Sequence, residues 1–289
     1  MNKWIMGARL RTLPAAFTPV FAATALAYRQ ASKIDWLNAL LALLVGVSLQ
    51  IGVNYSNDYS DGIKGSDESR VGPTRLVGSG LAKPVAVKRA AIFTYIIGAA
   101  FGTVLAFRTN WILILVGATA LIAAWFYTGG NDPYGYRGLG EFSVFIFFGL
   151  VATIGTYYAV TNSISIWVII LGVEMGLLAC AILAINNLRD LPKDKEVGKR
   201  TLAVRLGDQG ARRLLVSLIL LALIIQLTFL KLTPMAILPI MMAPYAFRII
   251  NQVRGGATGP SLIPALGSTA KLQALMGLWI VIAFVASKP

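Results

Sequence analysis

Two short groups of acidic and amide side chains are the residues of this sequence best suited to chemistry. Within each group the residues lie three or four positions apart, so that a continuous helix would place them on one face. The first group consists of Asn54, Asp58 and Asp61, and the second of Asn186, Asp190 and Asp194. Pro192 is expected to end or kink the second helix before Asp194, because proline has no backbone N–H to donate.

A segment rich in lysine and arginine follows each group. Mg2+ prefers oxygen ligands and is commonly held by one or two carboxylates together with the phosphates of a substrate. Carboxylates surrounded by cations therefore predict a site for divalent ions and a phosphate-bearing substrate.

The elements that must position these groups are membrane helices. The chain has 289 residues, of which 57% are hydrophobic and 13% are charged, whereas soluble proteins carry roughly 25% charged residues. Its apolar runs have the length needed to cross roughly 30 Å of hydrocarbon. We therefore predict an all-α polytopic membrane protein with nine spans, near residues 14–30, 37–57, 89–107, 111–128, 141–161, 166–188, 213–233, 235–251 and 269–287.

The distribution of charge sets the expected orientation. With the N-terminus in the cytoplasm, most of the 26 Lys and Arg residues fall on the cytoplasmic side, which agrees with the positive-inside rule. Topology thus accounts for much of the net charge of +14, and no nucleic-acid partner is expected. Of the 12 carboxylates, only Asp35 and Glu174 lie away from that side, so the site is predicted there.

Several classes of site are excluded by composition. The sequence has no histidine, which excludes a Ser-His-Asp triad and histidine metal sites. Cys180 is the single cysteine, which excludes thiolate clusters and disulfides within the chain. The first twelve residues form a short basic arm without the pattern of a cleavable signal.

Three basic segments are candidates for binding phosphate. Arg11 precedes the first span, where it either anchors the topology or reaches the substrate. The loop over residues 62–88 is rich in glycine, whose backbone N–H groups can approach a phosphate closely. Its cations are Lys64, Arg70 and Arg75. Lys199 and Arg200 follow the second acidic group.

The loop over residues 127–141 combines tyrosines and glycines with Arg137 and Glu141. One interpretation is an interfacial aromatic belt with a turn. The other is a substrate-facing loop whose aromatic rings shield a carbocation. Glu174 lies inside an apolar run, where ionisable residues are costly, and the sequence alone assigns it no role.

A faint internal repeat organises the single domain, which covers residues 1–289. In each half an Asn-x3-Asp group is followed by a Val-Gly pair, at 71–72 and 197–198, and a basic run. We interpret the chain as pseudo-repeat halves over residues 1–130 and 131–251, followed by the last helix at 269–287.

Five motifs in order resemble the UbiA superfamily of membrane prenyltransferases. They are Arg-Thr-Leu-Pro at 11–14, Asn-Asp-Tyr-Ser-Asp at 57–61, Arg-Val-Gly-Pro-Thr-Arg-Leu-Val-Gly-Ser-Gly at 70–80, Tyr-Arg-Gly-Leu-Gly-Glu at 136–141, and Asn-Asn-Leu-Arg-Asp with Gly-Lys-Arg-Thr-Leu-Ala-Val-Arg-Leu-Gly at 186–207. The superfamily often carries a third acid four residues after Asp61, where this chain has Gly65. Asp67 lies two positions further on. This departure resembles the branch that prenylates 1,4-dihydroxy-2-naphthoate in menaquinone synthesis.

The resemblance implies a nine-helix fold around a central cavity, with a cytoplasmic cap of loops. It implies Mg2+-dependent transfer of a polyprenyl group from its diphosphate to an aromatic acid in the cell membrane, with loss of CO2 in the naphthoate branch. The metal ligands and catalytic residues would be Asp58, Asp61, Asp190 and Asp194. The residues around the diphosphate would be Arg11, Lys64, Arg75, Lys199, Arg200, Asn54, Asn57, Asn186 and Asn187. We further place Tyr136, Arg137 and Glu141 near the acceptor.

Other functions remain open at this stage. A different acceptor, such as 4-hydroxybenzoate, would leave the mechanism unchanged. A transporter would be expected to place its ionisable residues near the bilayer midplane, and here Glu174 alone does so. A transferase of phospholipid head groups would share the acidic metal site. Membrane lipid is the expected surrounding, and no protein partner is evident.

Overall fold

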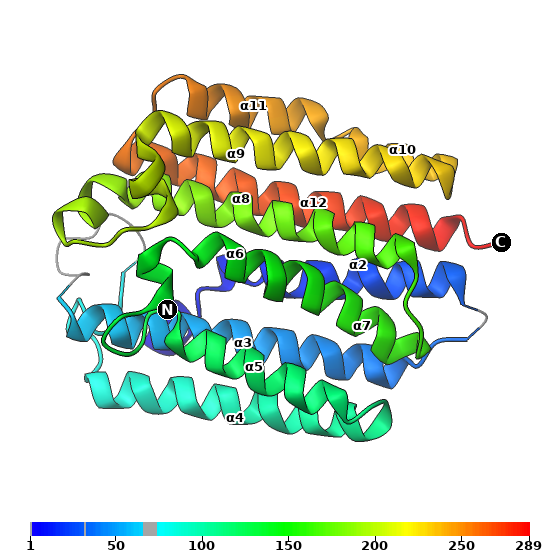
Figure 1. Cartoon of the computed structure of the whole chain (residues 1–289), viewed down its shortest axis with the longest axis horizontal. Coiled ribbons are helices and arrows are strands. Elements are labelled where there is room, and N and C mark those ends of the chain that lie inside the picture. Colours follow the sequence, from blue (N-terminus) through cyan, green and yellow to red (C-terminus); the bar gives the residue numbers. More distant parts are fainter. Residues whose placement is uncertain (1, 32, 66–73) are drawn as a thin grey trace.

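Long helices lie side by side and form a bundle whose loops gather at two opposite ends (Figure 1). This computed structural model describes residues 2–31, 33–65 and 74–289. The helical segments are α1 (Lys3–Ala8), η1 (Leu10–Thr12), α2 (Pro14–Gln30), α3 (Trp36–Ile63), α4 (Pro84–Arg108), α5 (Ile112–Phe126), η2 (Tyr134–Arg137), α6 (Gly140–Val144), η3 (Phe145–Val151), α7 (Ala152–Thr161), α8 (Ile166–Glu196), α9 (Leu202–Thr228), η4 (Phe229–Lys231), η5 (Pro234–Ala236), α10 (Ile237–Ile240), α11 (Ala243–Arg254), η6 (Gly259–Leu262) and α12 (Ile263–Ala286).

The prediction of an all-helical multi-pass membrane protein is confirmed, because every element among the described residues is helical. Seven helical segments are individually long and apolar enough to cross a bilayer. An eighth is formed if the segments Lys3–Thr12 and Pro14–Gln30, which meet at a bend of 50°, count as one span. Each of the nine predicted spans overlaps a helical segment, but α5 has only 15 residues. The count of nine is therefore not confirmed.

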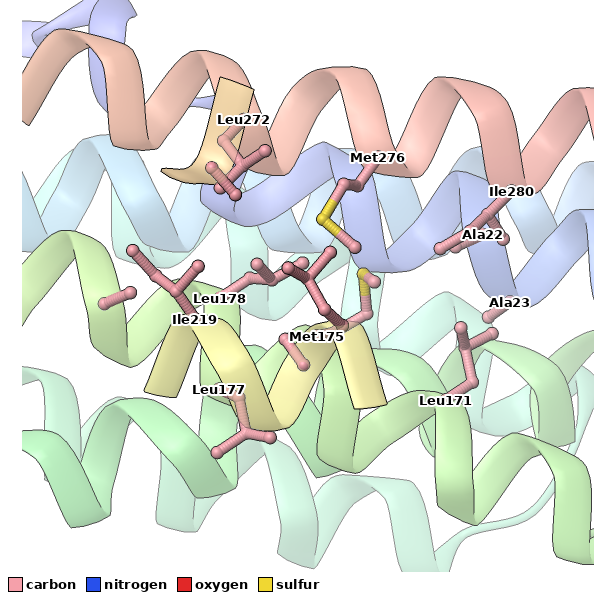
Figure 2. Packing of buried hydrophobic residues seen from close by; sticks show 14 of the residues in the cluster. Ala22, Ala23, Leu171, Met175, Leu177, Leu178, Ile219, Leu272, Met276 and Ile280 are labelled. Atoms are coloured by element: carbon pink, nitrogen blue, oxygen red, sulfur yellow. The ribbon is translucent and has the colours of Figure 1, made fainter. Parts of the chain in front are cut away.

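Helix α8 is the centre of the bundle. It packs against α9, α12, α2 and the π-helical segment η3, and 72% of its most apolar 18-residue window is buried. Figure 2 shows Leu178 of α8 among Ile219 of α9 and Leu272 of α12, within one cluster of buried apolar side chains. This packing holds α8 from several sides and so fixes the position of the polar residues at its end.

Pro192 does not end the second helix, because α8 continues through it to Glu196. Proline removes one backbone donor, and the last turn is still closed by the N–H of Val197, which donates to the carbonyl of Lys193 at 3.0 Å. Because the helix continues, Asp194 stays on the helical face that carries Asn187 and Asp190.

The backbone of η3 comes close to that of α8 where Gly149 of η3 faces Gly172 and Gly176 of α8. A Cβ added at Gly149 would lie 2.4 Å from the Cα of Gly176 and 2.8 Å from the carbonyl oxygen of Gly172. Such distances leave no room for a side chain, so glycine is required there for the two backbones to approach.

Replacing Gly149 with alanine is expected to force η3 away from α8 and to lower the unfolding free energy by about 1–3 kcal/mol, as overpacking does. Thermal unfolding in detergent measures the loss. Gly155→Ala is the matched control in the same region, because a Cβ there meets nothing within 4 Å. Equal melting temperatures for the two variants would contradict the close approach.

Glu174 lies in α8 away from the polar end, and its side chain is fully buried. Among the described residues neither of its carboxylate oxygens has a hydrogen-bond partner.

Two residues of the sequence motifs, Asp67 and Arg70, lie outside the described residues. The internal duplication stays a prediction.

Candidate active site

A cavity of about 150 Å³ lies between the last turns of α3 and α8. It is closed by η2 and by the segment that joins α8 to α9. Its lining residues are Arg9, Asn57, Asp61, Arg75, Tyr127, Thr128, Gly135, Tyr136, Leu183, Asn186, Asn187, Asp190, Lys193, Asp194, Lys199 and Thr201. Of the first group, the structure thus brings Asp61 alone, with the neighbouring Asn57, to the cavity that is lined by all of the second group.

Asp61 is the acidic residue that α3 presents to the cavity. Its carboxylate accepts hydrogen bonds from the hydroxyl of Tyr136 and from Nζ of Lys199, the latter at 3.1 Å. A guanidinium nitrogen of Arg75 lies 3.7 Å from its other oxygen. Because Lys199 and Arg75 also line the cavity, Asp61 is surrounded by cations that can turn to an anion bound there.

Helix α8 presents two further carboxylates, of Asp190 and Asp194. Asp190 is bound by Arg189, whose Nε and one terminal nitrogen donate to the two carboxylate oxygens at 2.7 and 2.6 Å. Asp194 is 9% exposed, and the hydroxyl of Thr201 lies 3.5 Å from one of its oxygens. The backbone N–H of Lys199 donates to the carbonyl of Asp194 at 2.8 Å, which ties the following segment to the end of α8.

Asp58 lies behind the cavity. It is fully buried, and its carboxylate accepts hydrogen bonds from the backbone N–H groups of Leu76 and Val77 at 2.8 and 3.0 Å. Helical spacing correctly predicted one polar face for α3, but the segment after residue 73 covers this part of that face. Asp58 therefore holds the backbone that carries Arg75.

Asn54 is likewise turned away from the cavity. Its amide nitrogen donates to the carbonyl of Ala8 and to the hydroxyl of Thr12, each at 2.9 Å. These bonds fix the N-terminal arm against α3.

The arm presents Arg9 to the cavity, whereas Arg11 is exposed. Arg9 has a left-handed backbone conformation, with φ of 51°, between α1 and η1. One of its terminal nitrogens lies 3.4 Å from the carbonyl of Asn54 and 4.0 Å from Asp58. This left-handed residue separates α1 from η1, so that Arg9 lines the cavity and Arg11 is exposed.

Four cations line the cavity, namely Arg9, Arg75, Lys193 and Lys199. The ammonium group of Lys193 is buried and, among the described residues, has no hydrogen-bond partner.

Lys64 lies just outside the cavity, where it donates to the carbonyl of Thr128 at 2.9 Å and faces the ring of Tyr136. Partial burial lowers the pKa of Lys64, an effect that Asp61 opposes and Lys199 reinforces. Arg200 is exposed.

The three residues predicted near the acceptor have different positions. Tyr136 lines the cavity and lies beneath the ammonium group of Lys199, 4.3 Å from its ring centroid. Arg137 instead points outward and pairs with Asp132 at 3.0 Å, with both side chains more than half exposed. Glu141 is buried and accepts a hydrogen bond from the amide nitrogen of Asn187 at 2.9 Å.

Sequence reasoning missed Arg9, Lys193 and the neutral wall formed by Tyr127 and Leu183. Lys193 could have been found, since it follows Asn186 by seven residues and Asp190 by three and so shares their helical face. Arg9 and Tyr127 depend on turns whose direction the sequence does not reveal.

The donor set fits Mg2+ when a diphosphate is also present. Within the described part of the chain, no three of the Asp, Glu and Cys side chains come close enough to hold an ion by themselves. Two of the carboxylates are paired with protein cations, Asp61 with Lys199 and Asp190 with Arg189. Mg2+ usually takes one or two carboxylates and completes its shell with phosphate oxygens and water, so three carboxylates around one cavity suit an ion shared with substrate.

Comparisons with known proteins agree with this geometry. The sequence matches the UbiA prenyltransferase family over residues 16–257. It is 48% identical over 268 residues to a 1,4-dihydroxy-2-naphthoate octaprenyltransferase of Mycobacterium tuberculosis, covering 92% of this chain and 91% of that protein. It is 42% identical over 231 residues to the Escherichia coli protein of the same name, covering 76% and 75%.

The fold is similar to solved structures of distant proteins. A UbiA homologue from Archaeoglobus fulgidus bound to DMAPP and Mg2+ has a TM-score of 0.67 at 17% identity, covering 99% of this chain and all of that one. A UbiA homologue from Aeropyrum pernix, without ligand, has a TM-score of 0.73 at 15% identity, covering 93% and 97%. At such identities the likeness concerns the fold.

Proposed function

The chain belongs to the UbiA prenyltransferase family, and on this premise we propose that it transfers a polyprenyl group from its diphosphate to 1,4-dihydroxy-2-naphthoate, with release of CO2 and diphosphate. The observation that carries the proposal is the meeting of Asp61, Asp190 and Asp194 with four cations in one cavity. The relatives named for this acceptor support the choice of substrate, because they are 40–48% identical over most of the chain.

The cations of the cavity are suited to stabilise the leaving group. As the bond between the allylic carbon and its oxygen breaks, the electron pair leaves with the diphosphate. Arg9, Arg75, Lys193 and Lys199 are placed to bind the developing negative charge, and such stabilisation is commonly the largest catalytic contribution. Mg2+, held by the carboxylates and the diphosphate, would supply further charge neutralisation.

The neutral wall of the cavity is suited to the acceptor. Tyr127 and Leu183 offer an aromatic and an apolar surface, and the ring of Tyr136 can face an allylic cation. In the proposed reaction the ring carbon that bears the carboxylate attacks the allylic carbon. The carboxylate then leaves as CO2, and its bonding electrons restore the aromatic ring.

Glu141 acts on the acceptor through Asn187. Because the amide nitrogen of Asn187 donates to Glu141, its carbonyl oxygen is left to accept a hydrogen bond from an acceptor hydroxyl. Glu141→Leu is expected to raise the KM for the acceptor about tenfold, the effect of losing roughly one such hydrogen bond, without changing the KM for the prenyl diphosphate. Glu141→Gln keeps an accepting oxygen and is the matched control. A rise in the diphosphate KM alone would contradict this role.

We also place the cavity on the cytoplasmic side of the cell membrane, because the segments that line it belong to the part of the sequence in which most Lys and Arg residues fall. Cys180 is buried and is the single cysteine, so it leaves a clean background for labelling. In Asp132→Cys, a membrane-impermeant thiol reagent is expected to label the exposed loop in opened vesicles but not in intact cells. Labelling of intact cells would reverse the orientation.

The reaction itself is tested with purified protein in lipid vesicles, Mg2+ and a polyprenyl diphosphate. 1,4-Dihydroxy-2-naphthoate and 4-hydroxybenzoate are offered separately, and product masses are read by mass spectrometry. We expect a prenylated naphthoquinol that lacks the carboxylate. A prenylated 4-hydroxybenzoate as the main product would keep the chemistry and refute the acceptor.

A further inference from the structure

We propose that Arg189 is a positioning residue that permanently holds Asp190 and Asn186 in the orientation needed to bind a divalent cation. This inference rests on the proposed function in so far as that function uses a metal ion. It adds a residue that touches neither substrate nor metal but determines how tightly the metal binds.

The contacts of Arg189 are all directed at this one task. Its side chain is 1% exposed. Nε and one terminal nitrogen bind the two carboxylate oxygens of Asp190 at 2.7 and 2.6 Å, and the same terminal nitrogen binds the side-chain oxygen of Asn186 at 2.9 Å. A planar guanidinium that makes two bonds to one carboxylate fixes its orientation as well as its charge.

Arg189 differs from the cations around Asp61 in its location. Lys199 and Arg75 line the cavity, so they can turn from Asp61 to a bound diphosphate. Arg189 is buried outside the set of cavity-lining residues, and it has no comparable path to the substrate. When a cation enters, Arg189 therefore remains bound to Asp190 while Lys199 and Arg75 exchange partners.

Arg189 and a metal ion can bind Asp190 at the same time. An ionised carboxylate has about four lone-pair sites, and the guanidinium uses two of them. The guanidinium alone therefore does not occupy the whole carboxylate, and Asp190 and Asn186 both line the cavity, where an ion can reach them. Partners that orient metal ligands from behind typically change metal affinity by about 10–100-fold when they are removed.

A purely structural role does not explain this arginine well. Its second terminal nitrogen is buried and, within the described residues, has no hydrogen-bond partner. Replacing a buried ion pair by apolar side chains of similar volume is often neutral or stabilising. An arginine that leaves one buried donor unsatisfied, and that binds two cavity residues, is better explained by the orientation it imposes on them.

The test measures metal binding without turnover. Mn2+ is titrated into purified protein that carries an unreactive prenyl thiodiphosphate, and free Mn2+ is read by electron paramagnetic resonance. For Arg189→Gln we expect the dissociation constant for Mn2+ to rise about 10–100-fold. The KM for the prenyl diphosphate at saturating Mg2+ is expected to stay near that of the unmodified protein.

Two further variants make the outcome decisive. Arg189→Lys keeps the positive charge but loses the planar guanidinium, and we expect an intermediate loss of Mn2+ affinity. If Arg189→Gln does not fold, the Mn2+ affinity of Arg189→Lys tests the inference instead. Lys199→Gln is expected to raise the KM for the prenyl diphosphate instead. Folded Arg189 variants that bind Mn2+ as tightly as the unmodified protein would overturn the inference. Failure of the naphthoate reaction would not affect this assay, which contains no acceptor.

Discussion

Replacing Asp61 or Asp190 with asparagine is expected to lower kcat about 10²–10³-fold while the protein still folds. Each carboxylate lines the cavity, and the loss of one group that stabilises a developing charge has an effect of this size. Asparagine keeps an oxygen that can accept from Tyr136 at Asp61, or from Arg189 at Asp190. Because these hydrogen bonds remain, we expect both variants to fold.

Single-turnover rates at saturating substrate and Mg2+ measure this effect. Asp132→Asn is the control, since Asp132 is exposed and pairs with Arg137 at the surface. Full activity of either cavity variant, with unchanged dependence on Mg2+, would show that these carboxylates do not take part in the reaction.

Replacing Asp58 with alanine is expected to lower both stability and substrate binding. The change leaves the N–H groups of Leu76 and Val77 without their carboxylate acceptor, and a buried unsatisfied donor costs about 1–3 kcal/mol. The same segment carries Arg75, so the KM for the prenyl diphosphate is expected to rise together with the loss of thermal stability. Asp58→Asn retains one accepting oxygen and should lose less of both.

This pair of variants separates two roles for Asp58. If Asp58 holds the segment, stability and diphosphate KM change together, and the Mg2+ dependence of the rate stays the same. If Asp58 binds the ion directly, as the sequence motif implied, Asp58→Asn would raise the Mg2+ concentration needed for the half-maximal rate. The melting temperature would then stay unchanged.

The fold class was predictable because it depends on composition and on the length of apolar runs. The meeting of Asp61 with Asp190 and Asp194 was predictable in part, because helical spacing is a local property and the motifs resemble a known family. The helical spacing also placed Lys193 on the correct face, although its significance was overlooked.

The remaining features depend on tertiary contacts. Arg9 lines the cavity in place of Arg11, and Arg9 has a left-handed backbone conformation between α1 and η1. Asp58 lies on the predicted face of α3 but is covered by residues 76 and 77. Arg137 has the right charge for an acceptor carboxylate, yet η2 directs it to Asp132. In each case the residue type was informative, while the direction of the side chain was set by a neighbouring segment.

Prenyl transfer coupled to loss of CO2 can be measured with acceptor that is labelled with 13C in its carboxylate. Purified protein in vesicles is given this acceptor, a polyprenyl diphosphate and Mg2+, and labelled CO2, diphosphate and prenylated product are quantified together. We expect equal amounts of all three from the unmodified protein, and almost none from Asp190→Asn. A prenylated product that retains the label, or release of diphosphate without CO2, would contradict the proposed reaction.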